Sequence, residues 1–459
     1  MSTSSAHSKW ARALAWFAIP ALFLSWGALG LRGSWYYYDE WSLIHSELTS
    51  NWGQALFYDF NGHWWSEMFL LYRVQVLGLG LDHHYLVECA FLTSLVGLQL
   101  ALAFVLRSAR VPLFTSVLLG GLLAYLPGAV QNSSFVVQCA NNTVYVLGLV
   151  ALGLILRGHS SFRSAIAVGA LLLVAVPCDS GTALSMILLT TCVACMKWRD
   201  RRLLAIVPAL VTLGSWYLWG DLGATWPGTP GHRVVVVGHL IIASLGALVG
   251  APLAMQAPTG LVVMVLLAAL LVGAHRAGLI RGDVRALLVG GFVAAGVTVI
   301  GIAQARGGLL VGNFNEFNRY LVQIDIPLVI ALAPLAMAVA RTPRVNHVLR
   351  LRPFMRGAAP VVITFMFLIG VLNLHDVLLT PFQQSGARVK HDVASAALTI
   401  QQGCPSGMTM MTDALPASME SPQMTVALLQ ELLRRGKLTI TPGVVIDSVV
   451  QSRICRLDQ

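Results

Sequence analysis

The sequence predicts an all-α polytopic membrane protein with about 11 transmembrane helices and a small α/β domain at the C-terminal end. Two observations lead to this prediction. Of the 459 residues, 56% are hydrophobic and only 11% are charged, and the mean hydropathy is +0.73. Soluble domains carry about 25% charged residues, so this chain could not cover a water-facing surface. Its apolar residues also recur in runs of about 17–25 residues, the length that crosses a bilayer.

Eleven apolar runs are long enough to be membrane-spanning helices. The first follows a polar segment with Lys9 and has no small-residue cleavage site, so we expect a retained helix and not a signal peptide. A tight turn at 177–181 joins the fifth and sixth helices into a hairpin. The predicted helices lie at residues 12–31, 85–106, 112–130, 140–156, 164–178, 181–196, 203–219, 258–275, 285–304, 321–340 and 358–377.

The distribution of Lys and Arg predicts the orientation. The loops expected inside hold 18 of the 30 cationic residues, the outer loops before the tail hold five, and the tail holds seven. By the positive-inside rule, the N-terminus is cytoplasmic and the C-terminus periplasmic in a bacterial inner membrane. The same rule explains the net charge of +10, so we expect no nucleic-acid partner. If Val234–Met255 spanned the membrane, the basic loops Arg276–Arg285 and Arg341–Arg356 would lie outside, against this rule. We therefore expect this segment to be re-entrant or interfacial.

The predicted domains are a membrane module at 1–377, with a long first outer loop at 32–84, and a small periplasmic domain at 378–459. The first loop is rich in Trp and Tyr, which lie at headgroup depth, so we expect short helices on the membrane surface. In a periplasmic tail, a disulfide between Cys404 and Cys455 is plausible. Cys192 and Cys195 form a CxxC inside an apolar run without His, and packing is expected there, not zinc.

The first outer loop holds the most informative polar residues. Asp39 and Glu40 directly follow an aromatic run, and the same loop continues to His63 and Arg73. A carboxylate, an imidazole and a guanidinium in one aromatic-walled loop suit a polar site at the membrane surface. The alternative interpretation is that the acids are hydrated loop charges and that His63 is an interfacial packing residue.

A second polar cluster lies between the ninth and tenth predicted helices. Arg319, at the mouth of an apolar helix, either snorkels to lipid phosphates or clamps a ligand phosphate. Asp179, in the turn of the hairpin, is a third candidate, and Asp325 is an acid inside the tenth helix. The other residues of the second cluster are Arg306, Asn318 and Tyr320.

These motifs resemble a known family. The segment Tyr38-Asp39-Glu40-Trp41 resembles the start of the first outer loop in the GT-C fold of membrane glycosyltransferases, and it is similar to the Asp-Glu signature of protein O-mannosyltransferase relatives. The family also includes arabinofuranosyltransferase-type enzymes. The segments Asn61-Gly62-His63, Leu70-Leu71-Tyr72-Arg73, and Arg306 followed by Asn318-Arg319-Tyr320 are similar to a pattern in bacterial members.

The resemblance implies a polyprenyl-phosphate-linked sugar as donor and a glycan, glycolipid or protein as acceptor on the periplasmic face. It implies that Asp39 is the general base and that Glu40 and His63 orient the acceptor or the base. Arg319 would stabilise the departing lipid phosphate with Arg306 or Arg73. No metal or other cofactor is expected. The resemblance does not specify which sugar is transferred or which acceptor receives it.

Three other functions are compatible with the sequence. A transporter or flippase for lipid-linked glycans would place polar residues near the bilayer midplane, whereas most candidates here gather at one face. An O-antigen ligase or polymerase would have its large outer loop late in the chain, whereas here the long loop is the first. A non-catalytic assembly subunit would tolerate loss of the Asp39 carboxylate.

Overall fold

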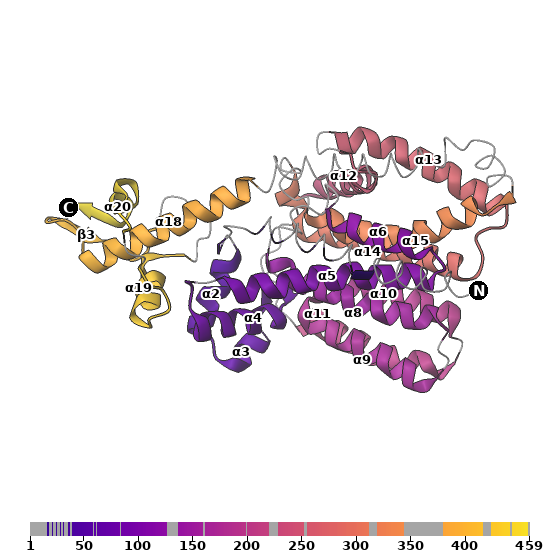
Figure 1. Ribbon diagram of the computed structural model, residues 1–459, viewed down its shortest axis with the longest axis horizontal. Helices are drawn as coiled ribbons and strands as arrows, with labels where there is room; N and C mark the ends of the chain where they lie inside the picture. Colours follow the sequence, from indigo (N-terminus) through magenta and orange to yellow (C-terminus); the bar gives the residue numbers. More distant parts are fainter. Residues whose placement is uncertain are drawn as a thin grey trace, which may run out of the picture.

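A computed structural model describes most of the chain and shows a helical bundle with a smaller mixed unit at one end (Figure 1). The predicted helix 358–377 and most of the predicted helix 12–31 lie outside the described residues. Apart from a few isolated positions before residue 32, the described residues are 35–36, 39–57, 59–60, 62–82, 84–125, 136–158, 161–198, 200–219, 228–251, 255–311, 319–343, 380–415, 424–440 and 443–457.

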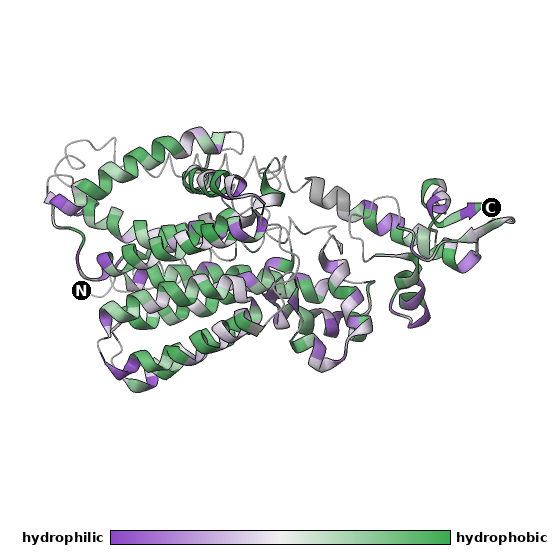
Figure 2. Cartoon of the chain, turned by 180° about the vertical axis from the view of Figure 1, so that it is seen from behind, coloured by the Kyte–Doolittle hydropathy of each residue, from purple (hydrophilic) through white to green (hydrophobic). Residues whose placement is uncertain are grey.

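The bundle consists of long apolar helices. Within the described ranges, seven helices are long and apolar enough to cross a membrane, so the chain is a multi-pass membrane protein. Figure 2 shows that hydrophobic residues dominate these helices. The seven are α5 (Tyr85–Ser108), α8 (Cys139–Leu156), α10 (Ser180–Lys197), α12 (Pro230–Leu248), α13 (Gln256–Arg276), α14 (Gly282–Leu310) and α15 (Arg319–Ala340). The described part of the bundle also contains the shorter helices α6 (Leu113–Tyr125), α9 (Phe162–Cys178) and α11 (Val207–Trp219). Short 3-10 helices η3 (Val136–Gln138) and η4 (Arg201–Ile206) precede α8 and α11.

Most predicted helices have counterparts with similar bounds, but α14 is longer than predicted. It continues six residues beyond the predicted end at 304 and so includes Gly307 and Gly308. Glycine lowers helix propensity by only about 1 kcal/mol, which the packing of buried Gly307 and Leu310 offsets. Arg306 therefore lies on a helix and not in the loop where the sequence placed it.

Helix α12 covers the segment that the charge rule placed outside the spans. Thr229 caps it by accepting a hydrogen bond from the backbone N–H of His232 (3.2 Å), and Pro230 occupies the first turn. Helix α12 is strongly foreshortened in Figure 1, whereas α13, α14 and α15 run across the view. An inclined helix of 19 residues fits a tilted span and an interfacial helix equally well, so its placement in the membrane stays a prediction.

The two ends of the bundle differ in charge. At one end, Lys197 pairs with Asp283 at 2.7 Å and Arg341 Nη2 donates to the carbonyl of Arg110 (2.8 Å). We call this the basic end. We call the opposite end, where α5, α8 and α10 begin and the turn between α9 and α10 lies, the loop end.

The first loop lies at the loop end, and the tail extends beyond it, away from the bundle (Figure 1). The loop contains α2 (Asp39–Thr49), α3 (Trp52–Leu56), the hairpin strands β1 (Asp59–Phe60) and β2 (His63–Trp64), α4 (Ser66–Arg73) and the π-helix η1 (Val74–Leu79). Short helices were predicted here. The tail contains α18 (Thr380–Gln402), β3 (Met408–Met410), α19 (Val426–Arg434), α20 (Ser448–Ile454) and β4 (Cys455–Leu457). Strands β3 and β4 pair antiparallel, so the tail has the mixed α/β character that the sequence predicted.

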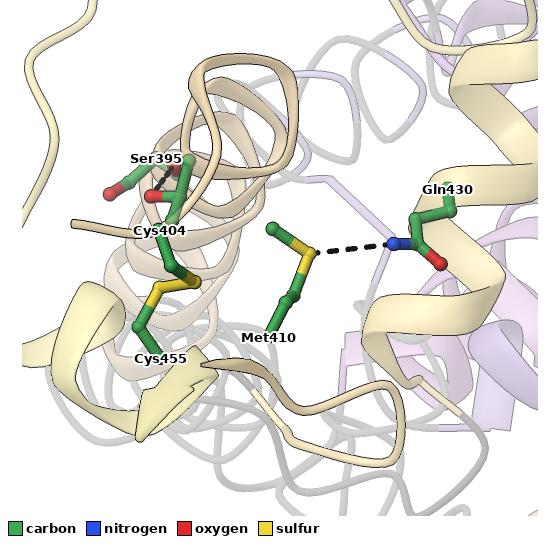
Figure 3. Close-up of a disulfide and its surroundings, with 6 residues drawn as sticks. Ser395, Cys404, Met410, Gln430 and Cys455 are labelled. Carbon is green, nitrogen blue, oxygen red and sulfur yellow. Dashed lines mark hydrogen bonds between the residues drawn. A yellow bond between two sulfur atoms is a disulfide. The ribbon is translucent and has the colours of Figure 1, made fainter. Parts of the chain in front are cut away.

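The tail is attached to the first loop. The backbone N–H of Leu81 donates to the carbonyl of Lys437 (2.7 Å), and Thr439 donates to the Asp82 carboxylate through its backbone and its hydroxyl. Both segments also contribute to one hydrophobic cluster. A disulfide joins Cys404 to Cys455, as the sequence suggested, and links the end of α18 to β4 (Figure 3).

Candidate functional site

A short β-hairpin in the first loop positions His63. Gly62, in its turn, has a φ of 85°, a left-handed conformation that glycine adopts without strain, and its N–H donates to the Asp59 carboxylate (2.6 Å). Phe60 pairs with His63 across the two strands. The hairpin therefore holds His63 at a defined place on the loop end of the bundle.

His63 contacts Asp179, which lies 116 residues later in the turn between α9 and α10. Its Nδ1 lies 3.0 Å from Asp179 Oδ1. The neighbouring Trp64 backbone N–H donates to the hydroxyl of Ser180 (3.1 Å). Gly181 lies against the pair, because a Cβ there would lie 2.5 Å from the His63 ring, which would have to shift away from its place beside Asp179. The structure thus brings together two residues that the sequence selected separately.

Asp179 is held as a buried anion. It is the N-cap of α10, and it accepts hydrogen bonds from the backbone N–H of Gly181 (2.9 Å) and from the Thr182 hydroxyl (2.9 Å). Burial alone would raise the pKa of Asp179, but His63 and the bonds from Thr182 lower it below its ordinary value. An ionised Asp179 favours the tautomer of His63 that carries its proton on Nδ1.

This geometry leaves Nε2 of His63 as the basic ring nitrogen. The His63 side chain is 35% exposed, whereas that of Asp179 is 2% exposed. An imidazole held by a buried carboxylate in this way can accept a proton from a hydroxyl, and the carboxylate then stabilises the imidazolium. The pair is therefore chemically suited to general base catalysis.

Glu67 is a further acid in this region, and the sequence interpretation missed it. It lies in the first turn of α4, and its Oε1 accepts a hydrogen bond from the Thr143 hydroxyl (2.7 Å) and contacts the Cys139 thiol at 3.7 Å. Burial raises the pKa of Glu67, although the bond from Thr143 lowers it. An acid four residues after His63 in an aromatic stretch was the available signal, but its partners on α8 are invisible in the sequence.

Aromatic rings surround the hairpin. Trp64 stacks on Trp216 of α11 with ring centroids 4.8 Å apart, and Phe57 packs against Trp64 at 5.6 Å. On the other face of the hairpin, Phe60 stacks on Trp65 at 5.0 Å. These contacts agree with the aromatic-walled loop that the sequence predicted.

Glu40 lies in a separate buried cluster. It accepts a hydrogen bond from the Tyr72 hydroxyl, and its Oε1 lies 2.8 Å from Nε2 of His84. The ring of Tyr36 packs edge-on against His84 at 4.3 Å. Glu40 is only 2% exposed, so its structural partners are internal. Asp39 is the first residue of α2, and its side chain lies outside the described part of the chain.

Arg73 is also internal. Its Nη1 lies 3.1 Å from Oε2 of Glu47 and donates to the carbonyl of Ser50 (3.2 Å). The guanidinium also lies 4.4 Å from the ring centre of Trp52. Burial raises the pKa of Glu47 to about 7, although Arg73 lowers it. Arg73 thus holds the first loop together.

The second predicted cluster is only partly described. Arg306 lies near the end of α14, where Gln304 accepts a hydrogen bond from Arg233 of α12 (2.6 Å). Tyr320 packs against the hydrophobic cluster between α12, α14 and α15. Asn318 lies outside the described residues, and Arg319 begins α15 with a side chain that is not described.

Comparisons with known proteins identify no family for this chain. No protein-family model matches the sequence, and no curated protein matches it. Within the described residues, no group of three or more His, Cys, Asp or Glu side chains is arranged to hold a metal ion. The prediction of a metal-free site stays a prediction.

Proposed function

We propose that this protein is a GT-C-like membrane glycosyltransferase that moves a sugar from a polyprenyl-phosphate donor to an acceptor hydroxyl on the periplasmic face of a bacterial inner membrane. One observation supports this proposal most: the His63–Asp179 pair, with Nδ1 and Oδ1 3.0 Å apart, lies at the loop end of the bundle inside an aromatic-walled loop. An enzyme that uses a membrane-embedded donor and a water-soluble or surface acceptor needs its base at the membrane surface, where the loop end of the bundle is proposed to lie.

The proposed reaction is a substitution at the anomeric carbon. Nε2 of His63 takes the proton of the acceptor hydroxyl while the acceptor oxygen forms a bond to that carbon. The bond from the carbon to the phosphate oxygen breaks, and its electron pair leaves with the lipid phosphate. Asp179 stabilises the imidazolium that forms. A well-placed base contributes about 10²–10⁴ in rate.

Asp39 is the alternative base in the same loop, on the strength of the motif alone. The two assignments differ in a measurable way, because Asp39→Asn removes activity only if this carboxylate takes the proton. In either case Glu40 supports the loop from within its buried cluster with His84 and Tyr72.

The departing phosphate needs a cation. We assign this role to Arg306 and Arg319, the two arginines of the second polar cluster. Arg73 lies in the first loop, where it is paired with Glu47. Arg binds phosphate through two parallel hydrogen bonds, and Arg306 lies on the last turns of a rigid helix. Asn318 and Tyr320 flank Arg319 and are proposed to contact the same ligand.

Two observations support the proposed orientation. Lys and Arg residues gather at the basic end, which suits the cytoplasmic side under the positive-inside rule. The Cys404–Cys455 disulfide lies in the tail, which contacts the first loop through Leu81 and Asp82, and disulfides persist in oxidising compartments such as the periplasm.

A lipid-linked glycan transporter is the second candidate function. The observation in its favour is Asp325 on α15, which is 1% exposed and accepts a hydrogen bond from Ser244 of α12. Buried acids within membrane helices often belong to transport or proton pathways. This acid could equally hold α12 against α15 in an enzyme.

The test uses purified protein in proteoliposomes with a panel of polyprenyl-phosphate sugars and a mixture of glycan, glycolipid and peptide acceptors. The proposal predicts formation of a glycosylated acceptor from at least one donor. Movement of the intact donor between leaflets without transfer would identify a transporter. Neither transfer nor movement with any donor would remove both candidates.

A further inference from the structure

Trp64 is the residue through which the hairpin of the first loop enters the bundle. It directly follows His63 in the chain, and its ring packs against the hydrophobic core of the membrane helices. Other apolar residues of the first loop, such as Phe60 and Met68, belong instead to the cluster that the loop shares with the tail. The Trp64 ring therefore connects the hairpin that carries His63 to the bundle.

Three contacts hold the Trp64 ring. Trp216 of α11 stacks on it, with ring centroids 4.8 Å apart and ring planes inclined by 19°. Phe57, at the end of α3, packs against it at 5.6 Å. The indole Nε1 donates a hydrogen bond to the carbonyl of Leu56 (2.7 Å). Phe57 and Leu56 belong to the same loop as Trp64, so of these three contacts the stack on Trp216 is the one that reaches the bundle.

Trp216 is in turn fixed relative to Asp179. Helix α11 packs against α9 and α10, and the turn between those two helices carries Asp179. The next residue of α11, Tyr217, packs against the bundle core, and its hydroxyl donates to the carbonyl of Ser180 (3.4 Å). Neighbouring residues of a helix keep a fixed spacing and direction. Trp216 and Asp179 therefore belong to one rigid part of the molecule.

The His63–Asp179 pair joins this rigid part to the hairpin. Beside the pair itself, the Trp64 backbone N–H donates to the hydroxyl of Ser180 (3.1 Å). A single hydrogen bond lets the hairpin tilt about it, whereas two stacked rings oppose a tilt because their planes must stay nearly parallel. The stack thus fixes the direction from which the His63 ring approaches the Asp179 carboxylate.

We infer that Trp216 is a positioning residue, which sets the His63 ring against Asp179 through its stack on Trp64. The inference rests on the proposed function, in which this pair is the general base. Trp216 needs no contact with the substrate to act in this way. Misplacing a reacting group by about 1 Å can lower a rate about 100-fold, so a change at Trp216 should reach the chemistry.

The test measures kcat and KM of sugar transfer for Trp216→Leu, which keeps an apolar side chain but removes the flat ring. We expect kcat to fall about 10–100-fold and KM to change less than about two-fold, because the base is misplaced while the groups that bind donor and acceptor are kept. Trp216→Phe keeps a ring that can stack, so its kcat should stay within about three-fold of the wild-type value.

The matched control is Trp198→Leu, at a buried tryptophan of the basic end. It removes the same ring from the bundle without touching the hairpin, so the folded variant should keep the wild-type kcat. Trp64→Leu removes the other ring of the stack and should reproduce the kcat of Trp216→Leu. It replaces Trp216→Leu in every measurement if that variant does not fold, as thermal unfolding would show.

A double-mutant cycle with Asp179→Asn separates positioning from general support of the loop. Asparagine keeps the N-cap of α10 but removes the charge beside His63. If Trp216 acts through the pair, Trp216→Leu should lower kcat by less than about two-fold in the Asp179→Asn background, because the pair is already impaired. Support of the loop alone would lower kcat by the same factor in both backgrounds.

Equal factors in the two backgrounds would overturn the inference and leave the proposed function intact. Wild-type kcat in Trp216→Leu would have the same meaning. Absence of transfer in the wild-type protein would instead overturn the proposed function, and with it the inference.

Discussion

Glu40 and His84, 44 residues apart in the chain, form a buried pair in which the carboxylate Oε1 lies 2.8 Å from the imidazole Nε2. The pair joins the start of α2 to the residue before α5, and so fixes where the first loop meets the bundle. Glu88, one turn into α5, lies 3.3 Å from the other ring nitrogen. His84 is thus held between two acids.

Glu40→Gln should destabilise the protein. The substitution keeps the size of the side chain but removes the charge opposite His84, and breaking a buried ion pair costs about 3–5 kcal/mol. We expect a lower midpoint of thermal unfolding in detergent, followed by Trp fluorescence. The control Asp413→Asn, at an exposed acid of the tail, should change stability by less than about 0.5 kcal/mol. Equal midpoints for the two variants would show that the Glu40 pair contributes nothing.

His84 should make stability depend on pH. Burial lowers its pKa, but Glu40 and Glu88 raise it more, to about 9 from the ordinary 6.5. The folded protein therefore binds a proton that the unfolded chain releases between these values. The stabilisation, about 3 kcal/mol at most, is complete below pH 6.5 and is lost as the pH rises through 9. The midpoint of thermal unfolding, measured between pH 6 and 10, should decrease as the pH rises from 6.5 to 9. In His84→Gln, this dependence of the midpoint on pH should be weaker. A curve of the same slope in His84→Gln would assign the effect to another group.

Arg73→Ala should lower the stability of the first loop and leave the binding of the lipid phosphate unchanged. Without Arg73 the Glu47 carboxyl, whose pKa burial already raises to about 7, takes up a proton, so the expected loss is that of the broken hydrogen bonds, about 1–3 kcal/mol. The double variant Glu47→Gln/Arg73→Ala should be about as stable as Arg73→Ala, because the carboxyl is already neutral in the single variant. Denaturation curves of the four proteins measure the coupling. A phosphate ligand would behave differently: the single variant would keep its stability, and KM for the lipid donor would rise.

The tail disulfide gives a test of orientation. In Cys455→Ser, the freed Cys404 should react with a membrane-impermeant maleimide added to spheroplasts, whereas the wild-type protein should show only the background of its other cysteines. The variant should also be less stable, because the bond closes a loop of 51 residues, a constraint worth about 4 kcal/mol. Labelling only after the membrane is permeabilised would place the tail in the cytoplasm and contradict the proposed orientation.

The sequence predicted the bounds of most apolar helices well, because long apolar runs mark segments that are able to cross a bilayer. That eleven of them span the membrane stays a prediction. Helices α5, α8, α9, α10 and α13 lie within a few residues of their predicted bounds. The predicted end of α14 at residue 304 was wrong, because the helix continues through Gly307 and Gly308 to Leu310, where tertiary packing offsets the low helix propensity of glycine.

The candidate site was predictable only residue by residue. His63 and Asp179 each stood out as a polar residue in an informative segment, but their contact spans 116 residues and no local pattern records it. The same reason explains the burial of Glu40 and the omission of Glu67, whose partner Thr143 lies 76 residues away. Chemistry that depends on residue type was visible in the sequence, and chemistry that depends on tertiary pairing was not.

The most direct test of the central claim is the rate of sugar transfer by His63→Gln compared with His45→Gln in the same proteoliposomes. Glutamine can still donate to Asp179 but cannot take a proton, and His45 is an exposed histidine of the same loop. The proposed mechanism predicts that His63→Gln lowers the rate at least about 100-fold with an unchanged unfolding midpoint, while His45→Gln keeps the wild-type rate. Transfer by His63→Gln at the wild-type rate would contradict it.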